Sequence, residues 1–108
     1  ALLAARDEVD ATTASEELLA YVAAIVRRTR SLPSVSLGAS PRAAVHLLAA
    51  SKAAARLGGR SFVTPDDVVA MAAPVLRHRL LLRPEAELER YRPDDAVATA
   101  VAAVAVPR

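Results

Sequence analysis

Two helix starts, each marked by a proline, stand on either side of a double glycine, and this punctuation constrains the fold more than any other feature. The first start is Ser40-Pro41-Arg42, and the second is Thr64-Pro65 followed by two aspartates. Serine and threonine are preferred N-cap residues, and a proline at the first helical position loses no needed hydrogen bond. Gly58-Gly59 supplies the left-handed stop between them. The pattern predicts one helix over 41–57 and another from Pro65 onward.

Apolar residues at helical spacing predict two further helices. The first starts near Thr13 to Ser15, where Thr13 and Glu16 fit a capping box, and gives way to a loop over 31–39. Its apolar face repeats at i, i+4, i+7 and i+8 and consists of Leu18, Val22, Ile25 and Val26. The last helix runs from Asp94 towards Val104 with a stripe of valines on one side. Because this last helix has few polar residues, we expect it to be buried against another surface.

The region after Pro65 is less regular. Pro74 lies inside the helix that begins at Pro65, and a proline in a helix interior should kink or split it. Residues 79–82 could form a last helical turn or a short strand, and the natural partner of a strand would be residues 61–63. We therefore expect a short two-stranded β element near 61–63 and 79–82, followed by a charged connection over 83–92.

Composition favours an all-α fold, a small helical bundle. Alanine, the strongest helix former, is abundant, and the aromatic residues are limited to Tyr21, Phe62 and Tyr91. The core must then be thin and built from Leu, Val and Ala, and we expect Tyr21 and Phe62 within it. A length of 108 residues suits a single domain. We place the bundle at 13–108 and interpret 1–12 as the tail of something that begins earlier.

Several classes of protein are disfavoured by what the sequence lacks. It has no cysteine, so disulfides and thiolate metal sites are excluded. Its formal charge is only +2, with acids and bases in near balance, which implies no strong general attraction to nucleic acid. No signal peptide opens the chain, and no apolar run approaches the length of a membrane span. We expect a soluble cytoplasmic protein.

No constellation of catalytic residues or metal ligands is visible in the sequence. Gly38, Gly58 and Gly59 are its only glycines, so the phosphate-binding pattern G-x-x-x-x-G-K-[ST] cannot be written. His46 and His78 lie far apart and lack the spacing of a metal site. The paired aspartates open helices, where they complement the helix dipole. We therefore expect no catalytic residue and no metal site in this chain.

Arg42 is the residue that these helix rules do not explain. It occupies the second position of its helix, where the dipole is positive and free backbone N–H groups attract anions. A cation there becomes favourable if an anion is shared between the guanidinium and the helix end, since arginine holds phosphate through paired hydrogen bonds. His46 lies one turn further on the same face. Spacing alone leaves a second interpretation open, in which Arg42 is solvated or pairs with a nearby carboxylate.

Four segments, in order and in register, resemble the lid domain of MoxR-family AAA+ ATPases. They are Leu19–Val22 with Thr29–Arg30, Leu37–Ala43, Gly59–Val68 and Pro74–Leu80. The second is similar to the family's G-A-S-P-R motif, the third to G-R-x-[FY]-V-T-P-x-D-V and the fourth to P-V-L-x-H-R. The resemblance covers residues 15–83 well and the flanks loosely. The motor subunit of magnesium chelatase is a close relative of this family.

The resemblance implies a role within a larger ATPase. In this family an upstream core carries the phosphate loop, the magnesium-binding acids and the catalytic glutamate, so ATP and Mg²⁺ would be bound mainly by a core preceding residues 1–12. The lid closes over ATP, and an arginine like Arg42, called sensor 2, reaches the terminal phosphate, with Ser40, Pro41 and His46 close to the nucleotide. The parent chain would be an ATPase, whereas this segment would not be catalytic alone.

The resemblance also implies partners. Subunits of this family assemble into homo-oligomeric rings, usually hexamers, that act as chaperones, often beside a protein with a von Willebrand factor A domain. Arg60, His78 and Arg79 either pack locally or contact the nucleotide or a neighbouring subunit.

Two other functions are weighed against the lid. A nucleic-acid-binding helical module would use the arginine clusters, although no helix presents the outward polar residues that read bases. A free-standing interaction domain would bind a partner helix on its apolar stripes. The first predicts DNA affinity that falls steeply with salt, and the second predicts a tight complex regardless of nucleotide.

Overall fold

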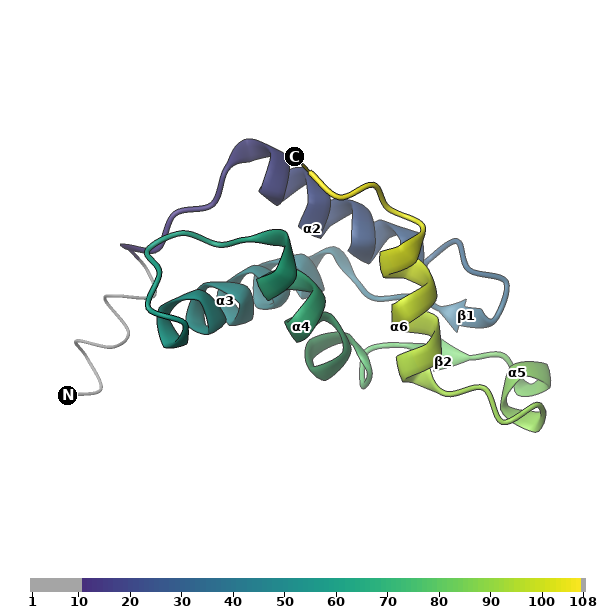
Figure 1. Cartoon of the computed structure of the whole chain (residues 1–108). Helices are drawn as coiled ribbons and strands as arrows, with labels where there is room; N and C mark the ends of the chain where they lie inside the picture. Colours follow the sequence, from purple (N-terminus) through teal and green to yellow (C-terminus); the bar gives the residue numbers. More distant parts are fainter. Residues whose placement is uncertain (1–10, 108) are drawn as a thin grey trace.

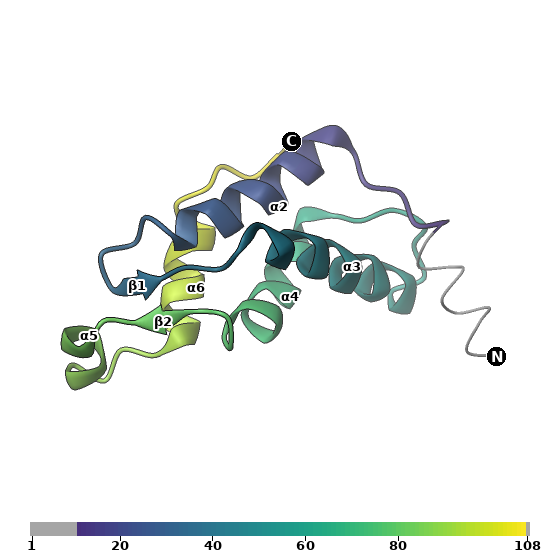
Figure 2. The ribbon, with the colours of Figure 1, turned by 180° about the vertical axis from the view of Figure 1, so that it is seen from behind.

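The computed structural model describes residues 11–107 and confirms the all-α bundle (Figure 1). Its elements, in chain order, are α2 (Glu16–Thr29), β1 (Val35–Leu37), α3 (Pro41–Leu57), α4 (Pro65–Leu76), β2 (Leu81–Leu82), α5 (Pro84–Leu88) and α6 (Pro93–Ala102). The four longer helices gather round one core, and β1, β2 and α5 extend from one end of it (Figures 1 and 2). Most of the expected tail over 1–12 lies outside the described residues.

Helix α3 begins and ends where the Ser40-Pro41 start signal and the Gly58-Gly59 stop signal predict. Ser40 is the N-cap residue and Pro41 the first helical residue. At the other end Gly59 has a φ of +79°, the left-handed conformation that glycine adopts without steric cost. The N–H of Arg60 then donates to the carbonyl of Ala55 at 2.9 Å, and the N–H of Gly59 donates to that of Arg56. These two bonds form a Schellman motif, which satisfies carbonyls at the helix end.

Helix α2 starts within the predicted range 13–15, but its cap is not the predicted one. Its N-cap is Ser15, whose hydroxyl oxygen accepts a hydrogen bond from the N–H of Leu18 at 3.1 Å. The predicted capping box at Thr13 is therefore wrong. The backbone of Thr13 instead pairs with the segment around Phe62: its N–H donates to the carbonyl of Ser61, and its carbonyl accepts from the N–H of Val63, both at 3.0 Å. A long-range backbone pairing replaces the local cap.

Pro74 does not split α4, which continues to Leu76. A proline at this position removes the hydrogen bond to the carbonyl of Ala70. Both residues are exposed, and the helix ends only two residues later, so water can satisfy that carbonyl. The predicted split is therefore absent, because the proline stands near the helix end on the solvent side, and the alternative, a kink, stays a prediction.

The two-stranded β element exists. One strand lies within the predicted range 79–82, but its partner is not the predicted segment 61–63. Strand β2 pairs antiparallel with β1, with Val35 opposite Leu82 and Leu37 opposite Leu81. Residues 61–63 instead lie beside Thr13, and Phe62 forms an isolated bridge with it. Strand β1 lies within the segment predicted to be a loop, and α5 lies within the predicted connection over 83–92.

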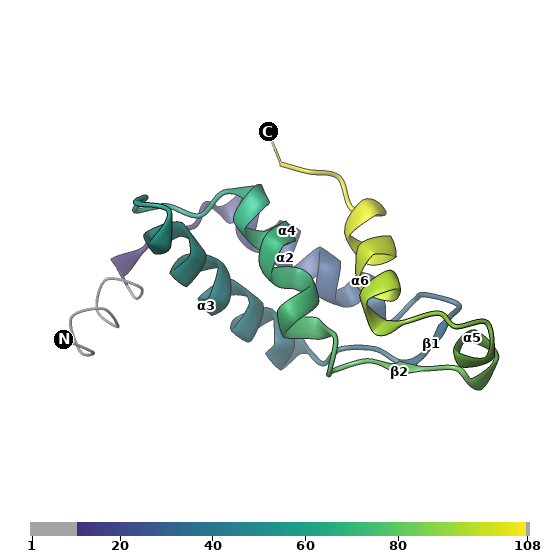
Figure 3. The same cartoon turned by 60° about the horizontal axis from the view of Figure 1, so that its bottom comes forward.

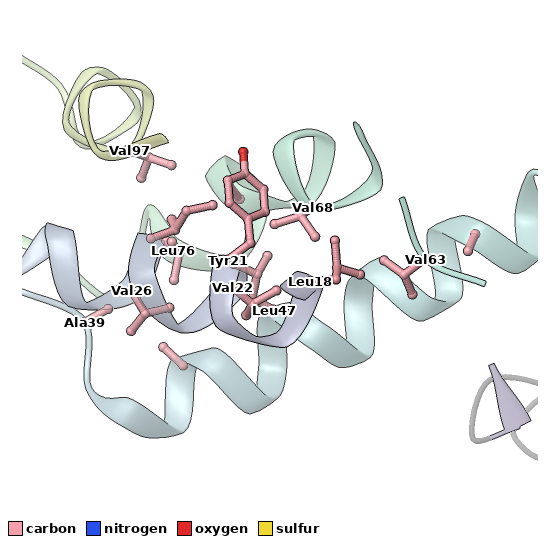
Figure 4. Packing of buried hydrophobic residues seen from close by; sticks show 14 residues of the cluster. Leu18, Tyr21, Val22, Val26, Ala39, Leu47, Val63, Val68, Leu76 and Val97 are labelled. Carbon is pink, nitrogen blue, oxygen red and sulfur yellow. The ribbon is translucent and has the colours of Figure 1, made fainter. Parts of the chain in front are cut away.

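The main core lies where α2, α3, α4 and α6 meet (Figure 4). Its largest fully buried aliphatic side chains are Leu18, Ile25, Val26, Leu47, Val68, Leu76 and Val97. Tyr21 is buried there as predicted, whereas Phe62 is 52 % exposed, and the prediction for Phe62 is wrong. Successive side chains of an extended segment point to opposite sides, so burying Val63 turns Phe62 outward. A second cluster of Leu32, Val35, Leu82, Ala96 and Ala100 joins the β element to α6.

Candidate functional site

Arg42 lies at the second position of α3 with its side chain exposed to solvent. Ser40, Pro41 and His46 are exposed at the same end of the helix. The hydroxyl of Ser40 makes no capping hydrogen bond, and the first turn of α3 contains no acidic residue. Within residues 11–107, no salt bridge or side-chain hydrogen bond involves Arg42. The interpretation that Arg42 pairs with a nearby carboxylate therefore has no support in the described part of the chain.

Thr29, the last residue of α2, fixes the start of α3. Its hydroxyl donates to the carbonyl of Val26 at 2.6 Å and accepts a hydrogen bond from the N–H of Ala39 at 3.0 Å. Thr29 and Ala39 are both completely buried, so water does not compete for these bonds. Because Ala39 directly precedes Ser40, this bond holds the entry to α3 against the end of α2.

Gly38 allows the chain to pass close to the end of α2. A Cβ atom at this position would lie 2.5 Å from Cγ and 2.6 Å from Cα of Arg30. Both distances are far below van der Waals contact, so any larger residue would force the two segments apart. In the G-A-S-P-R segment, Gly38 lies against Arg30, the buried Ala39 is hydrogen-bonded to Thr29, and Ser40 is the exposed N-cap of α3.

These features give the start of α3 the properties of an anion site. The dipole of α3 places partial positive charge at this end. Pro41 has no N–H and the N–H of Ala43 donates to the carbonyl of Ser40 at 2.9 Å, so the backbone offers an anion the dipole more than free donors. The Arg42 guanidinium adds a full charge with a fork of donors that matches phosphate oxygens. No acidic residue in the helix opposes an incoming anion, since α3 has the sequence PRAAVHLLAASKAAARL. The N-terminal end of α3 is therefore anchored to α2, exposed to solvent and positively charged.

Arg60 lies beyond the opposite end of α3, roughly 25 Å from Arg42 along a 17-residue helix. Its guanidinium forms a bidentate salt bridge with Asp67, with N–O distances of 2.6 and 2.9 Å. The same carboxylate accepts from the N–H of Thr64 at 2.8 Å and completes the capping box of α4. Arg60 therefore ties the end of α3 to the start of α4.

His78 and Arg79 follow the end of α4 and are exposed. Arg79 Nε donates to the carbonyl of Val75 at 3.2 Å. His78 lines a shallow hollow with Arg77, Arg92, Pro93 and Asp94, in which Arg77 and Asp94 form a salt bridge of 3.1 Å. The structure thus brings Ser40, Pro41, Arg42 and His46 together on α3, and places Arg60 and the His78-Arg79 pair elsewhere.

Two residues of this site were missed from the sequence, Thr29 and Gly38. One signal for Thr29 was available, because it continues the buried stripe of α2 at i+4 from Ile25. A hydroxyl on an apolar stripe needs a hydrogen-bond partner, but the sequence did not reveal which backbone group supplies it. Gly38 opens the G-A-S-P-R motif, but the sequence did not show that Arg30 lies against it, because this contact forms only when the chain turns back.

Between residues 11 and 107, no three His, Asp or Glu side chains gather as a metal-binding cluster would require. None of the helices described is both long enough and apolar enough to span a bilayer.

The described residues form a small helical bundle with an exposed arginine at the start of α3, which fits the lid domain expected from the four sequence motifs. Comparison with known families agrees, because the family model described as "AAA lid domain" matches residues 27–104. The chain therefore belongs to the AAA lid domain family. This membership favours the lid over the nucleic-acid-binding module and the free-standing interaction domain.

Individual relatives place the chain in the MoxR branch of AAA+ ATPases. It is 40% identical over 100 residues to "Uncharacterized protein YeaC" of Bacillus subtilis, covering 93% of this chain and 31% of that protein. It is 38% identical over 74 residues to "Chaperone MoxR1" of Mycobacterium tuberculosis, covering 68% of this chain and 20% of that protein. The chain is the lid region of a MoxR-family AAA+ ATPase.

A solved structure confirms the fold. The crystal structure of a protein titled a "putative ATPase" from Cytophaga hutchinsonii superposes with a TM-score of 0.89 at 31% sequence identity. The match covers 95% of this chain and 34% of that one. The chain thus spans about a third or less of the length of each of these three proteins.

Proposed function

We propose that this lid closes over ATP held by the core of its parent ATPase and that Arg42 is the sensor 2 residue, which contacts the terminal phosphate. The observation that supports this role is the exposed, unpaired guanidinium of Arg42 at the start of a helix without an opposing acid. Ser40, Pro41 and His46 flank the same helix start and would lie close to the nucleotide. The core would hold most of the ATP and the Mg²⁺.

The residues present fit a phosphate group. Bound ATP supplies a terminal phosphate whose negative charge is available to arginine. Arg42 would bind that phosphate through its forked N–H donors, and the α3 dipole would add a favourable interaction. His46, one turn further along, would contribute a second donor.

The anchoring of α3 suggests how this contact would be coupled to movement. The Thr29–Ala39 hydrogen bond and the close approach of Gly38 to Arg30 join α3 to α2, so a pull on Arg42 would move both helices together. Loss of the phosphate contact would release the lid as a rigid body. Arg42 would act as a positioning and sensing residue while the core performs hydrolysis.

The wider context of this role is proposed from the family. The parent would be a cytoplasmic ATPase that assembles into a homo-oligomeric ring, with a hexamer as the expected size, and acts as a chaperone. A protein with a von Willebrand factor A domain would be a partner. Arg60, His78 and Arg79 would lie at contacts with neighbouring subunits, where Arg60 would act while remaining bound to Asp67.

The test uses the complete ATPase that contains this lid. Arg42→Ala should lower the rate of ATP turnover at least about tenfold, which corresponds to about 1.4 kcal/mol of lost transition-state stabilisation. Arg42→Lys should recover little, because an ammonium group cannot form the forked contact. Arg83→Ala, which removes another exposed arginine far along the chain from α3, is the matched control and should turn over ATP normally. Normal turnover in the Arg42→Ala protein would refute the proposed role.

A further inference from the structure

The chain enters the described bundle at the end of α3 that lies opposite Arg42. Thr12 is buried, and its hydroxyl oxygen accepts a hydrogen bond of 2.7 Å from Nε of Arg56, in the last turn of α3. Figure 3 shows the purple start of the described chain beside this end of α3, whereas the other end of α3 lies towards β1. We call Thr12 and the next residue, Thr13, the strap. The strap is therefore fastened to the helix that carries Arg42, but at the far end of that helix.

Backbone hydrogen bonds fasten the second residue of the strap. The N–H of Thr13 donates to the carbonyl of Ser61, and the carbonyl of Thr13 accepts from the N–H of Val63, both at 3.0 Å. Ser61 and Val63 belong to the segment that connects α3 to α4. The next two residues are also fixed, since Ala14 packs against the main core and Ser15 caps α2. The strap thus joins the bundle without a loose segment between them.

The strap and Arg42 lie at opposite ends of one continuous helix. About 21 Å separate Arg42 from Arg56 along the axis of α3, at about 1.5 Å for each residue. After Pro41 the sequence of α3 contains neither proline nor glycine, the residues at which helices most often kink. A rotation of about 10° at the strap would therefore displace Arg42 by about 4 Å, which is more than the length of a hydrogen bond to a phosphate oxygen. A small movement at the strap becomes a large movement at the start of α3.

We infer that the strap is where the core moves the lid, and that the Arg56–Thr12 hydrogen bond passes this movement on to α3 and Arg42. The inference rests on the proposed function, in which the core precedes the strap and Arg42 contacts the phosphate. A hydrogen bond suits this task because it fixes the direction of a contact, whereas apolar packing at a buried site is non-directional. Arg56 and Thr12 are thus positioning residues, which act on the phosphate contact through α3.

The test measures steady-state ATP turnover by the complete ATPase. Thr12→Val keeps the volume of the side chain and removes the acceptor of the Arg56 hydrogen bond. It should lower kcat at least about fivefold, because a misplacement of about 1 Å far from the reacting atoms can cost up to about 100-fold. The KM for ATP should change less than kcat, since the core holds most of the ATP. Thr12→Ser keeps the hydroxyl and should restore most of the turnover.

Two matched controls lie beside the residues under test. Thr13→Val removes the neighbouring hydroxyl, which is exposed, so water can replace its bond to the carbonyl of Ser61. Lys52→Ala removes a cation one turn before Arg56 on α3, and no salt bridge between described residues involves Lys52. Both variants should turn over ATP with an unchanged kcat.

Combination with Arg42→Ala shows whether the strap acts through Arg42. Two residues that act through one contact lose it only once, so Thr12→Val combined with Arg42→Ala should turn over ATP as fast as Arg42→Ala alone. A strap that only stabilised the fold would add its own loss to the loss from Arg42→Ala.

The kinetic results separate this inference from the proposed function. Losses that multiply in the double variant, or a normal kcat in Thr12→Val, would overturn the inference about the strap and leave the role of Arg42 in place. Normal turnover in Arg42→Ala would instead overturn the proposed function, and this inference with it.

Amide hydrogen exchange tests the strap without relying on ATP turnover. The N–H groups of Thr13 and Val63 should exchange slowly in the unmodified ATPase, because both are hydrogen-bonded across the strap. Thr12→Val should speed both exchanges at least about tenfold, and unchanged exchange would overturn the inference. Circular dichroism establishes that each variant is folded. If Thr12→Val does not fold, Arg56→Gln, which removes the Nε donor of the same bond, takes its place in every comparison.

Discussion

The hydroxyl oxygen of Thr29 accepts a hydrogen bond from the backbone N–H of Ala39 at 3.0 Å, and both residues are completely buried. This bond crosses from the last residue of one helix to the residue just before the N-cap of the next. It therefore determines where α3 starts relative to α2, and with it the position of Arg42. A side chain with no surface exposure thus supports the exposed candidate site.

Replacing Thr29 by valine should destabilise the protein while leaving its shape almost unchanged. Valine matches threonine in size but leaves the buried N–H of Ala39 without a partner, which costs about 1–3 kcal/mol. Chemical denaturation measures the free energy of unfolding. Thr99→Val is the matched control, because the Thr99 hydroxyl is exposed and water can replace its bonds, so its effect should be within about 0.5 kcal/mol. Equal effects of the two substitutions would contradict the anchoring role of Thr29.

Gly38→Ala should be far more damaging than Gly58→Ala. The new Cβ at position 38 would collide with the backbone of Arg30, and overpacking of this kind costs about 1–3 kcal/mol. Gly58 has an ordinary φ of −82°, and its nearest neighbour is the end of the Arg60 side chain at 3.0 Å. Its replacement should change the free energy of unfolding by less than about 1 kcal/mol. Thermal or urea unfolding of both variants measures the difference, and similar stabilities would refute the steric argument.

Tyr21→Phe should leave the protein as stable as before or make it more stable. The Tyr21 hydroxyl is buried and has no hydrogen-bond partner among the residues described. An unsatisfied buried polar group costs about 1–3 kcal/mol, so its removal with the ring intact should be neutral or favourable. Urea denaturation at pH 7 measures this. A loss of more than about 1 kcal/mol would show that the hydroxyl has a partner.

The same hydroxyl predicts a dependence of stability on alkaline pH. Burial raises the pKa of Tyr21 above its ordinary value of 10.0, and the nearby Asp66 carboxylate raises it further. The folded state therefore holds the phenolic proton more tightly than the unfolded state, so stability is retained below pH 10 and falls as the pH rises above it. Denaturation between pH 8 and 11 should show a steeper loss for the unmodified protein than for Tyr21→Phe. Parallel curves would contradict the prediction.

The two salt bridges should differ in strength. Arg60–Asp67 is bidentate and its carboxylate side chain is 8% exposed, whereas Arg77–Asp94 has a single short contact and 40% exposure on each side. A double-mutant cycle with alanine should give a coupling energy of about 1.5–3 kcal/mol for the first pair. For the second pair the expected coupling is about 0.2–1 kcal/mol. Coupling energies in the reverse order would refute the importance assigned to the Arg60 bridge.

Local chemistry explains which parts of the fold were predictable from the sequence. Pro41, Pro65 and the Gly58-Gly59 pair fix helix boundaries through backbone geometry that depends on immediate neighbours, and α3 and α4 start at these prolines. The apolar stripe of α2 likewise identified its buried face. The resemblance carried by four motifs in order and in register identified the lid family, because such motifs are a property of the sequence alone.

The tertiary structure decided the features that depend on distant partners. Thr13 pairs with the segment around Phe62, and β2 pairs with β1, although the partners in each pair are far apart in the sequence. Phe62 faces solvent as a result of the Val63 side chain being buried. Gly38 and Thr29 acquire their roles only when the chain folds back on the end of α2. The sequence therefore determined the four longer helices and the family, through interactions between near neighbours. The fold determined the strand pairing and the rigid mounting of Arg42, because hydrogen bonds and steric contacts between distant segments exist only after packing.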